Sequence, residues 1–489
     1  MKSWLKISML LCCFGFLREL RPSDSFATEF LSGEWHDITS EQVNKELYPL
    51  GIYMNVGWLV IVLLVTDMLR YKPIIITSAC AGIILWSILL WTESLWELQV
   101  GQFFYGLYMA SEVAYYTYIY AKVDKDQYQK VTGNTRAAML AGKFLAGIIA
   151  QILLSAELMN YRDLNFLSLG TQIVSLFIGI GLPSVRKSIY FYASENLKQQ
   201  SVEQQHQQPP LPLTEIQLES ALTTNIPKEQ HHQQQQLQQP PTTQPQTTNG
   251  IELNTSGHKI IAANENEEPK FSCQNATRLL GLHVISAYSK PVVVEWSIWW
   301  ALATCGQLQV VSYVQFLWKE IDENHQSAYN GATDAIATLL GAAGALAAGF
   351  LNSHRYQKWN LWILTICSLF EGALLIWAAT TNSVWVAYAI HIVFYTVYFF
   401  VVTKASAIVA ENILEDSFGL IFGINTLVAL VAQSIFTLIV ITESGLSLQP
   451  RGQFLTFGGY FVVLSALYCL AGIVKHFKGN QNNELNINS

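Results

Sequence analysis

The chain has 489 residues, of which 51% are hydrophobic and only 13% are charged, and its formal net charge is −7. An ordinary soluble protein carries about 25% charged residues, whereas apolar runs of about 18 residues or more, typical of transmembrane helices, recur along both halves of this chain. A soluble enzyme, a disordered protein and a fibrous protein are therefore excluded. No basic stripe is present, so we do not expect nucleic acid as a partner.

Twelve apolar segments are each close to the length that an α-helix needs to cross a bilayer. Lys2 and Lys6 before the first segment would also suit a signal peptide, but we find no small-residue cleavage site and predict a helix. The sequence therefore predicts an all-α integral membrane protein with 12 transmembrane helices. The approximate ranges of the segments are 4–20, 48–68, 74–92, 98–121, 136–156, 164–183, 291–317, 328–351, 359–380, 384–410, 417–441 and 453–474.

A polar tract separates the sixth segment from the seventh. Residues 186–290 contain HHQQQQLQQPPTTQPQTT and almost no apolar periodicity. Such a tract cannot bury enough apolar surface to offset the entropy of ordering, so we predict a disordered Gln/Pro-rich loop. The loop divides an N-terminal six-helix bundle at 1–185 from a C-terminal six-helix bundle at 291–476, which a tail at 477–489 follows.

Lysine and arginine in the short loops predict the orientation in the membrane. Alternate loops are basic and the loops between them are mainly acidic, except that the loop at 411–416 is acidic where the rule requires a basic one. The majority places both termini and the central loop in the cytoplasm. The basic residues that decide this are Arg70, Lys72, Lys122, Lys125, Lys130, Arg136, Arg186, Lys187, Arg355 and Lys358.

Six titratable residues lie well inside the apolar segments, away from their ends. An ionised group at the centre of a bilayer costs about 2.5–3.5 kcal/mol, so it persists where it faces a partner, water or a substrate. These residues are Glu112, Lys143, Asp334, Glu371, His391 and Lys404.

Glu112 is followed by two tyrosines at helical spacing. Tyr115 and Tyr116 stand at i+3 and i+4, so they share one helix face with Glu112. A carboxylate beside aromatic rings suits an organic cation, because the acid supplies charge and the rings supply cation–π attraction. An internal ion pair between Glu112 and Lys143 on the next helix is an equally good interpretation.

The other buried charges each allow two interpretations. Asp334 lies among small residues that let helices approach closely, and it is either a second ligand or proton site or a hydrogen-bonded buried acid. Glu371 and Lys404 either pair with each other or line a water-filled path, and we favour a structural role. We expect His391 to be a hydrogen-bonded packing residue rather than a proton relay.

Asp67 and Arg70 end the second segment. An acid followed by basic residues there can form a gate contact in rocking transporters, although a solvated helix end explains it as well. We find no P-loop, no GxSxG and no HExxH, and the seven cysteines show no metal-ligand spacing. We therefore predict no enzyme, no cofactor and no metal, and any transport would use an ion or substrate gradient.

Several segments resemble, in order, the folate and thiamine carriers (solute carrier family 19). The resemblance covers all but the loop and the tail, and it implies a major-facilitator fold with alternating access to a central site. The segments are FGFLRELRPSDSFATEFLSG at 14–33, TDMLRYKP at 66–73, EVAYYTYIYAKVDKDQYQKVTGNTR at 112–136, WSIWWALATCG at 296–306, YVQFLW at 313–318, YNGATDAIAT at 329–338 and FGINT at 422–426.

The thiamine branch of that family resembles this chain better than the folate branch. Glu112 is similar to the acid that receives the aminopyrimidine of thiamine. The folate carrier resembles this chain less, since it has basic residues where Tyr395 and Gln433 stand here. Thiamine is a cation and folate a dianion, so the loss of these positive charges favours the cation. Asp24 and Asp334 match positions that are acidic in thiamine carriers, and Tyr115 matches an aromatic one.

Four positions depart from the thiamine carriers. Gly51 stands where those carriers have a tryptophan, and Ser312 where they have an asparagine. Lys143 and Lys404 stand where the vertebrate carriers have uncharged residues. Another cationic or neutral vitamin-like ligand is therefore still an alternative to thiamine.

We predict a secondary-active plasma-membrane transporter of thiamine, with a proton or an organic anion as the possible coupling partner. The alternatives are a carrier of folate or a similar anion that uses Lys143 and Lys404, and a non-transporting receptor or scaffold that uses the Gln-rich loop. The predicted substrate-binding residues are Asp24, Glu112, Tyr115, Tyr116, Ser312 and Asp334. The gating or coupling candidates are Asp67, Arg70, Lys143, Glu371 and Lys404.

Overall fold

In a computed structural model of the chain, every regular element among the described residues is a helix. Nine helices in this described part are long and apolar enough to cross a membrane. The other three predicted segments correspond to α1, to the α6–α7 pair and to α12. The predicted all-α membrane fold is thus confirmed. The described ranges are 3–122, 128–185, 273–322, 329–350, 360–413 and 417–487.

The first half follows the predicted segments and adds short helices after α1. Pro22 begins the 3₁₀-helix η1, where the missing proline N–H is not needed for a helical bond. The long helices are α1 (Ser3–Glu19), α4 (Tyr48–Met68), α5 (Lys72–Trp91), α6 (Leu95–Ala110), α7 (Glu112–Lys122), α8 (Tyr128–Ser155) and α9 (Tyr161–Gly181). The short elements are η1 (Pro22–Phe26), α2 (Ala27–Leu31), α3 (Ser40–Gln42) and η2 (Val43–Leu47).

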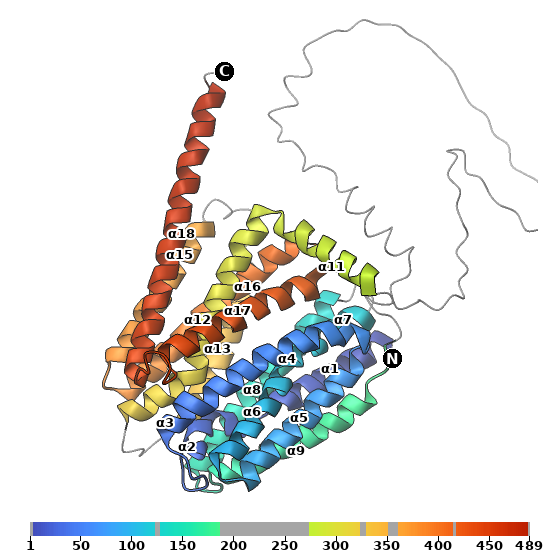
Figure 1. Ribbon diagram of the computed structural model, residues 1–489, viewed down its shortest axis with the longest axis vertical. Helices are drawn as coiled ribbons and strands as arrows, with labels where there is room; N and C mark the ends of the chain where they lie inside the picture. The colour runs from blue at the N-terminus through green and yellow to red at the C-terminus, as the bar shows by residue number, and fades with distance from the viewer. Residues whose placement is uncertain are drawn as a thin grey trace, which may run out of the picture. The chain divides into compact units, whose positions relative to one another are not determined.

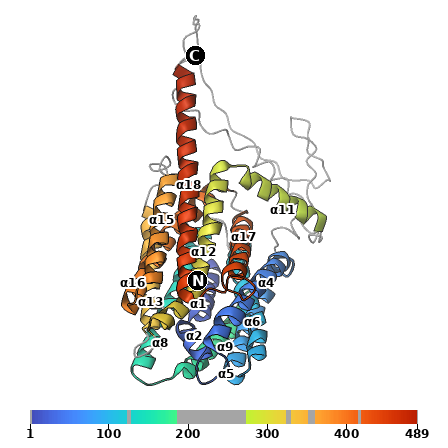
Figure 2. The same cartoon turned by 60° about the vertical axis from the view of Figure 1, so that its left-hand side comes forward.

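The second half also matches its predicted segments, and its last helix runs further than expected. That helix, α18, continues through most of the predicted tail at 477–489 and extends beyond its neighbours (Figures 1 and 2). The elements are α12 (Pro291–Ile321), α13 (Asn330–Phe350), α15 (Asn360–Thr380), α16 (Val384–Glu411), α17 (Phe418–Val440) and α18 (Pro450–Ile487).

One helix lies inside the range 186–290, which we predicted to be a disordered loop. It is α11 (Cys273–Tyr288), and its Tyr288 hydroxyl donates a 2.8 Å hydrogen bond to Asn425 of α17. The prediction missed this helix because the composition of the whole tract hides a 16-residue segment that tertiary contacts stabilise. Residues 186–272 lie outside the described residues, so the boundaries of the loop stay predictions.

The fourth apolar segment, predicted as one helix at 98–121, is two helices. Ser111 interrupts it between α6 and α7. The carbonyl of Tyr108 accepts a 2.9 Å hydrogen bond from Arg18 on α1. The prediction of a continuous helix was wrong because a partner from a distant helix satisfies this carbonyl, and local sequence does not show it. The interruption places Glu112 in the first turn of α7, where a carboxylate is favoured by the helix dipole.

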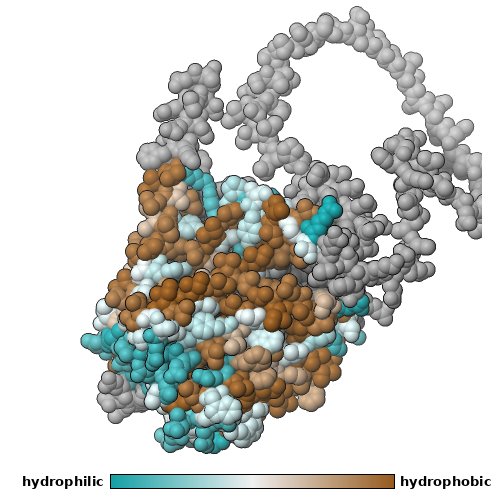
Figure 3. Space-filling model, viewed as in Figure 1, coloured by the Kyte–Doolittle hydropathy of each residue, from teal (hydrophilic) through white to brown (hydrophobic). Residues whose placement is uncertain are grey.

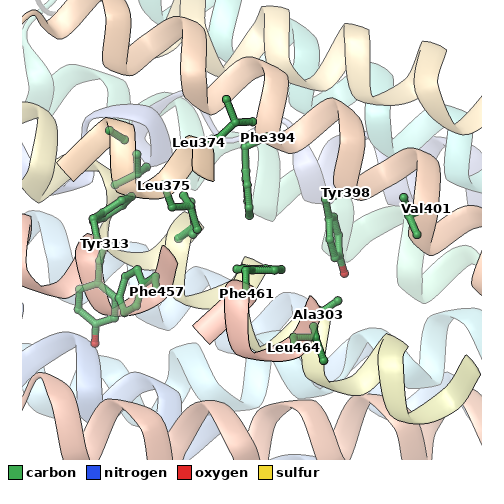
Figure 4. Close-up of a cluster of buried hydrophobic side chains, with 14 of the residues drawn as sticks. Ala303, Tyr313, Leu374, Leu375, Phe394, Tyr398, Val401, Phe457, Phe461 and Leu464 are labelled. Atoms are coloured by element: carbon green, nitrogen blue, oxygen red, sulfur yellow. The ribbon is translucent and has the colours of Figure 1, made fainter. Parts of the chain in front are cut away.

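Close packing of aromatic and branched side chains holds the second half together. Figure 4 shows this cluster, in which Phe394 of α16 faces Phe461 of α18. The two ring centroids lie 5.6 Å apart in an edge-to-face arrangement. Inside a bilayer, such van der Waals contacts replace water exclusion as the force between helices.

Large apolar side chains also cover the outside of the bundle. Phe177, Leu346 and Ile366 are 68%, 69% and 64% exposed. Figure 3 shows this apolar surface as a broad brown area, with hydrophilic residues gathered at the end where Figure 1 places α2 and α3. An apolar surface of this extent matches lipid, and the polar end matches water.

Residues up to 185 and residues from 291 onward form two groups of helices that lie side by side (Figures 1 and 2). At one end, η1 and α2 are hydrogen-bonded to α12 and α13, and we call this set of contacts the clasp. The Thr28 N–H donates to Gln315 (3.1 Å), whose amide donates to the Asp24 carbonyl (2.9 Å). Asn330 donates to Glu29 (3.1 Å). The clasp residues are Asp24, Thr28, Glu29, Ser32, Gln315, Lys319 and Asn330.

Two glycines let α8 and α13 cross in contact. A Cβ added to Gly147 would lie 2.5 Å from the carbonyl oxygen of Gly331 and 3.1 Å from the backbone nitrogen of Ala335. A Cβ added to Gly331 would lie 2.7 Å from the Gly147 carbonyl oxygen. The atoms that an added Cβ would meet belong to the backbone, so they cannot rotate away as side-chain atoms can.

We expect Gly147→Ala to destabilise the protein, although alanine favours a helix by about 1 kcal/mol over glycine. Overpacking against a backbone costs about 1–3 kcal/mol, so the net loss after this gain is subtracted should reach about 2 kcal/mol. Thermal unfolding of the purified protein in detergent measures it. Gly170→Ala on α9 is the matched control, because a Cβ there meets nothing within 4 Å. A melting temperature for Gly147→Ala that rises as much as that of Gly170→Ala would show that the crossing is not tight.

Candidate functional site

A cavity of about 300 Å³ lies between the two groups of helices. Pockets for small molecules commonly have volumes of roughly 300–1,000 Å³. Because both halves supply its walls, a molecule bound there would contact both at once. From the first half the polar and aromatic lining includes Arg21, Asp24, Tyr48, Trp86, Gln102, Tyr105 and Lys143. From the second half it includes Ser312, Gln315, Asp334, Thr338, His391 and Tyr395.

Two acids and two bases supply the fixed charge of this lining. Arg21 pairs with Asp24 at 3.2 Å. Lys143 contacts Tyr395 instead of an acid, with 3.4 Å from its Nζ to the hydroxyl and 5.5 Å to the ring centroid. Asp334, which has Ser25 within hydrogen-bonding reach, makes no ion pair within the described ranges. It is therefore the carboxylate in this lining that no arginine neutralises.

A chain of ion pairs leads from the cavity wall to Glu112. Arg21 also pairs with Glu19 at 3.2 Å, and Glu19 pairs with Arg18 at 3.1 Å. Arg18 in turn pairs with Glu112 at 3.2 Å. Together with Asp24, these three acids and two arginines carry a formal charge of −1.

Three of the six predicted substrate-binding residues line the cavity. They are Asp24 in η1, Ser312 on α12 and Asp334 on α13. Lys143, a gating candidate, and His391 line it too. The structure thus brings residues from before and after the central tract together in one site, although they lie far apart in the sequence.

Glu112 and the two tyrosines after it do not line this cavity. The Tyr115 side chain is 1% exposed, and its hydroxyl donates to the Leu11 carbonyl at 2.8 Å. The Tyr116 hydroxyl contacts the Met139 sulfur at 3.2 Å. The face that these residues share is turned toward α1 and α8. The ion pair of Glu112 is with Arg18, so the alternative pairing with Lys143 is not formed.

The remaining gating candidates lie away from the cavity. Glu371 on α15 is fully buried, and both its carboxylate oxygens lack a hydrogen-bond partner among the described residues. The pairing of Glu371 with Lys404 is therefore not formed. Arg70 adopts a left-handed backbone conformation, with φ of 59°. The side chain of Asp67 lies outside the described residues, so its gate contact stays a prediction.

Sequence reasoning missed several residues of the site. Gln102 and Tyr105 of α6 stand beside Gly51, where an added Cβ would collide with the Gln102 side-chain oxygen. The glycine therefore leaves room for a glutamine from the neighbouring helix. Arg18 and Arg21 were also missed, although the alternating charges of RELRPSD at 18–24 directly follow an apolar run.

The sequence of the chain is similar to those of known proteins of one family. The profile of the reduced folate carrier family matches residues 2–456. The chain is 34% identical to thiamine transporter 1 of Mus musculus over 483 residues, which covers 97% of this chain and 91% of that protein. It is 34% identical to thiamine transporter 2 of Homo sapiens, with 96% and 90% covered. It is 31% identical to folate transporter 1 of Caenorhabditis elegans, with 98% and 94% covered.

Solved structures agree on the fold. The nucleoside transporter NupG superposes with a TM-score of 0.56 at 13% identity, covering 96% of this chain and 99% of that chain. The POT family transporter PepTSo superposes with a TM-score of 0.58 at 12% identity, covering 97% and 99%. At these identities the likeness concerns the fold alone, which is of the major-facilitator type.

Proposed function

The chain belongs to the reduced folate carrier family, and we propose that within this family it carries the organic cation thiamine. The family consists of multi-pass membrane transporters of vitamins, so the chain is a transporter and not an enzyme. The receptor or scaffold interpretation has no support from these relatives. The charge of the site is what favours thiamine over folate as the substrate.

The charge balance around the cavity carries this proposal. Four acids and three bases occupy the cavity lining and the ion-pair chain together, so the whole set carries a formal charge of −1, although the four charges of the lining alone cancel. A dianion such as folate would meet the opposite field, which disfavours it. Aromatic rings of Tyr48, Trp86 and Tyr105 line the same cavity and supply stacking and cation–π attraction.

Four of the six predicted substrate-binding residues have a role in this proposal. Asp334 faces the positive charge of the substrate, because it is the lining carboxylate without an ion pair. Asp24 and Ser312 supply further acceptors and donors from opposite walls. Glu112 acts through Arg18, holding the charged chain that positions Asp24. A proton on Asp334 is the coupling partner that we test.

The same arrangement supports alternating access. The cavity has walls from both halves, and the clasp closes the end that carries η1 and α2. We propose that the halves rock about the cavity, so that the clasp opens when the other end closes. In the orientation that the basic loops predict, the clasp faces the outside of the cell and both termini face the cytoplasm.

One observation favours the anion alternative. Lys143 lines the cavity and makes no ion pair with a carboxylate within the described residues. A carboxylate of a folate-like substrate would find a partner there. The two substrates must therefore be compared directly.

Radiolabelled uptake in cells that express the chain tests the proposal, with thiamine and folate compared at two external pH values. We expect saturable thiamine uptake well above the vector control and little folate uptake. A dependence on pH would support proton coupling. Surface labelling in the same cells tests the plasma-membrane location. Folate uptake without thiamine uptake, by protein shown to be at the surface, would overturn the proposal.

A further inference from the structure

Lys143 is unusual because it places a positively charged side chain in a cavity that is proposed to bind a cationic substrate. Its ammonium group rests against the ring and hydroxyl of Tyr395. Arg21, the other base of the lining, is held by two acids, Glu19 and Asp24, each at 3.2 Å. Lys143 is therefore the base of this lining whose contact is with an aromatic side chain and not with a carboxylate.

The helix crossing places Lys143 near Asp334. Gly147 lies four residues after Lys143 on α8, and a Cβ there would stand 3.2 Å from the Cβ of Ala335, the neighbour of Asp334 on α13. Lys143 thus lies one helical turn from this crossing on α8 and Asp334 directly beside it on α13, and both side chains line the same cavity. A lysine carries its charge on a flexible four-carbon stem, so the ammonium can move between two partners at little cost.

Charged and titratable groups face Lys143 from every side of the cavity. Glu19 and Asp334 act on it most directly among the carboxylates. With Lys143 included, the four charges of the lining cancel, and with Lys143 removed they sum to −1. The groups from the surrounding elements are Glu19, Arg21 and Asp24 from α1 and η1, Tyr105 from α6, Asp334 from α13, and His391 and Tyr395 from α16.

We propose that Lys143 is a built-in cation that competes with the substrate for Asp334. In the unloaded carrier its ammonium pairs with Asp334 and neutralises the cavity. When a cationic substrate arrives at Asp334, the ammonium gives way to it and is held by Tyr395, whose ring and hydroxyl lie within its reach. This inference rests on the proposed function, since it concerns a cationic substrate.

Two measurable properties follow. Competition from the tethered ammonium weakens substrate binding, so its removal should tighten binding. Neutralisation of the empty cavity also lets the unloaded carrier change conformation without an isolated charge in a low-dielectric site. Without Lys143, return of the empty carrier should be slow, and transport should depend on substrate on the opposite side.

Lys143→Gln is the variant that tests both. We expect its KM for thiamine to fall about tenfold, which corresponds to about 1.4 kcal/mol of removed competition. Efflux from preloaded cells into thiamine-free medium should fall at least about fivefold, whereas exchange against external thiamine should be kept. Measuring the ratio of exchange to net efflux makes the result independent of how much protein reaches the surface.

Three further variants sharpen the test. Lys475→Gln makes the same substitution at an exposed position of α18, where Lys475 pairs with Glu295, and should leave both properties unchanged. Lys143→Arg keeps the charge and should keep net efflux. Lys143→Gln with Asp334→Asn restores a neutral lining, so its exchange of any residual substrate should no longer exceed its net efflux.

The outcomes separate this inference from the proposed function. Wild-type protein at the surface without thiamine uptake would overturn the proposed function. Wild-type uptake with an unchanged KM and an unchanged exchange ratio in Lys143→Gln would overturn the inference and leave the proposed function standing. A raised KM in Lys143→Gln would also overturn it, since that would make Lys143 a group that helps to bind the substrate.

Discussion

Asp334→Asn is expected to lower thiamine uptake at least about thirtyfold at low substrate concentration, because loss of one partner of a desolvated charge pair costs about 2–5 kcal/mol. The substitution keeps the size and polarity of the side chain, removes its charge and replaces one acceptor oxygen by a donor NH2 group. With Asp334 neutral, Lys143 leaves the cavity lining positive, which further repels a cation. Initial uptake rates, normalised to surface protein, measure the effect.

Glu443→Gln is the matched control for Asp334→Asn. Glu443 is exposed in the turn between α17 and α18, away from the cavity, so its loss of charge should leave uptake unchanged. If Asp334→Asn transports thiamine within about twofold of the wild type, Asp334 is not the residue that receives the positive charge.

Arg18→Met is expected to lower the free energy of unfolding by about 3–5 kcal/mol, because it strands acids that the guanidinium neutralises. Arg18 is 1% exposed, contacts Glu19 and Glu112, and has its guanidinium 4.5 Å from the centre of the Tyr108 ring. Methionine fills much of the same volume but meets none of these charges. Thermal and denaturant unfolding in detergent measure the loss.

A double-mutant cycle separates the Arg18–Glu112 pair from the rest of this network. Glu112→Gln alone should cost less than Arg18→Met, because the Glu112 side chain is 31% exposed and water can replace part of the interaction. The double variant should be more stable than the sum predicts, by about 1–2 kcal/mol. Arg278→Met on the exposed side of α11 is the control and should change stability by less than about 0.5 kcal/mol. Full additivity would show that the pair is not coupled.

Much of the fold was predictable because transmembrane helices depend on local composition. The segments 48–68 and 359–380 match α4 and α15 within a residue or two. The interruption at Ser111 was not predictable, since the Tyr108 carbonyl is satisfied by Arg18 from a helix about 90 residues earlier. The helix α11 was missed for the same reason, because its stability comes from contacts with α17.

Part of the site was predictable from the cost of charge in a membrane. That argument selected Asp334 and Lys143, and both line the cavity. It did not select Arg18 and Arg21, because Arg18 lies at the very end of the first apolar segment and Arg21 directly after it, and the argument considered only charges well inside a segment. The shared face of Glu112 and Tyr115 was inferred correctly, but periodicity cannot say whether a face is turned toward a cavity or toward another helix.

The polar character of the clasp bears on how fast the carrier can turn over. Each hydrogen bond between neutral groups contributes only about 0.5–1.5 kcal/mol net, and each one to a charged group, such as Glu29 or Lys319, about 1.5–3 kcal/mol, since water replaces the partner when the contact breaks. A few such bonds hold the two halves together without creating a deep energy minimum. An apolar contact of the same area would expose hydrophobic surface to water when it opens, and this would raise the activation barrier of every transport cycle. The clasp therefore closes this end of the cavity and still opens over a low activation barrier.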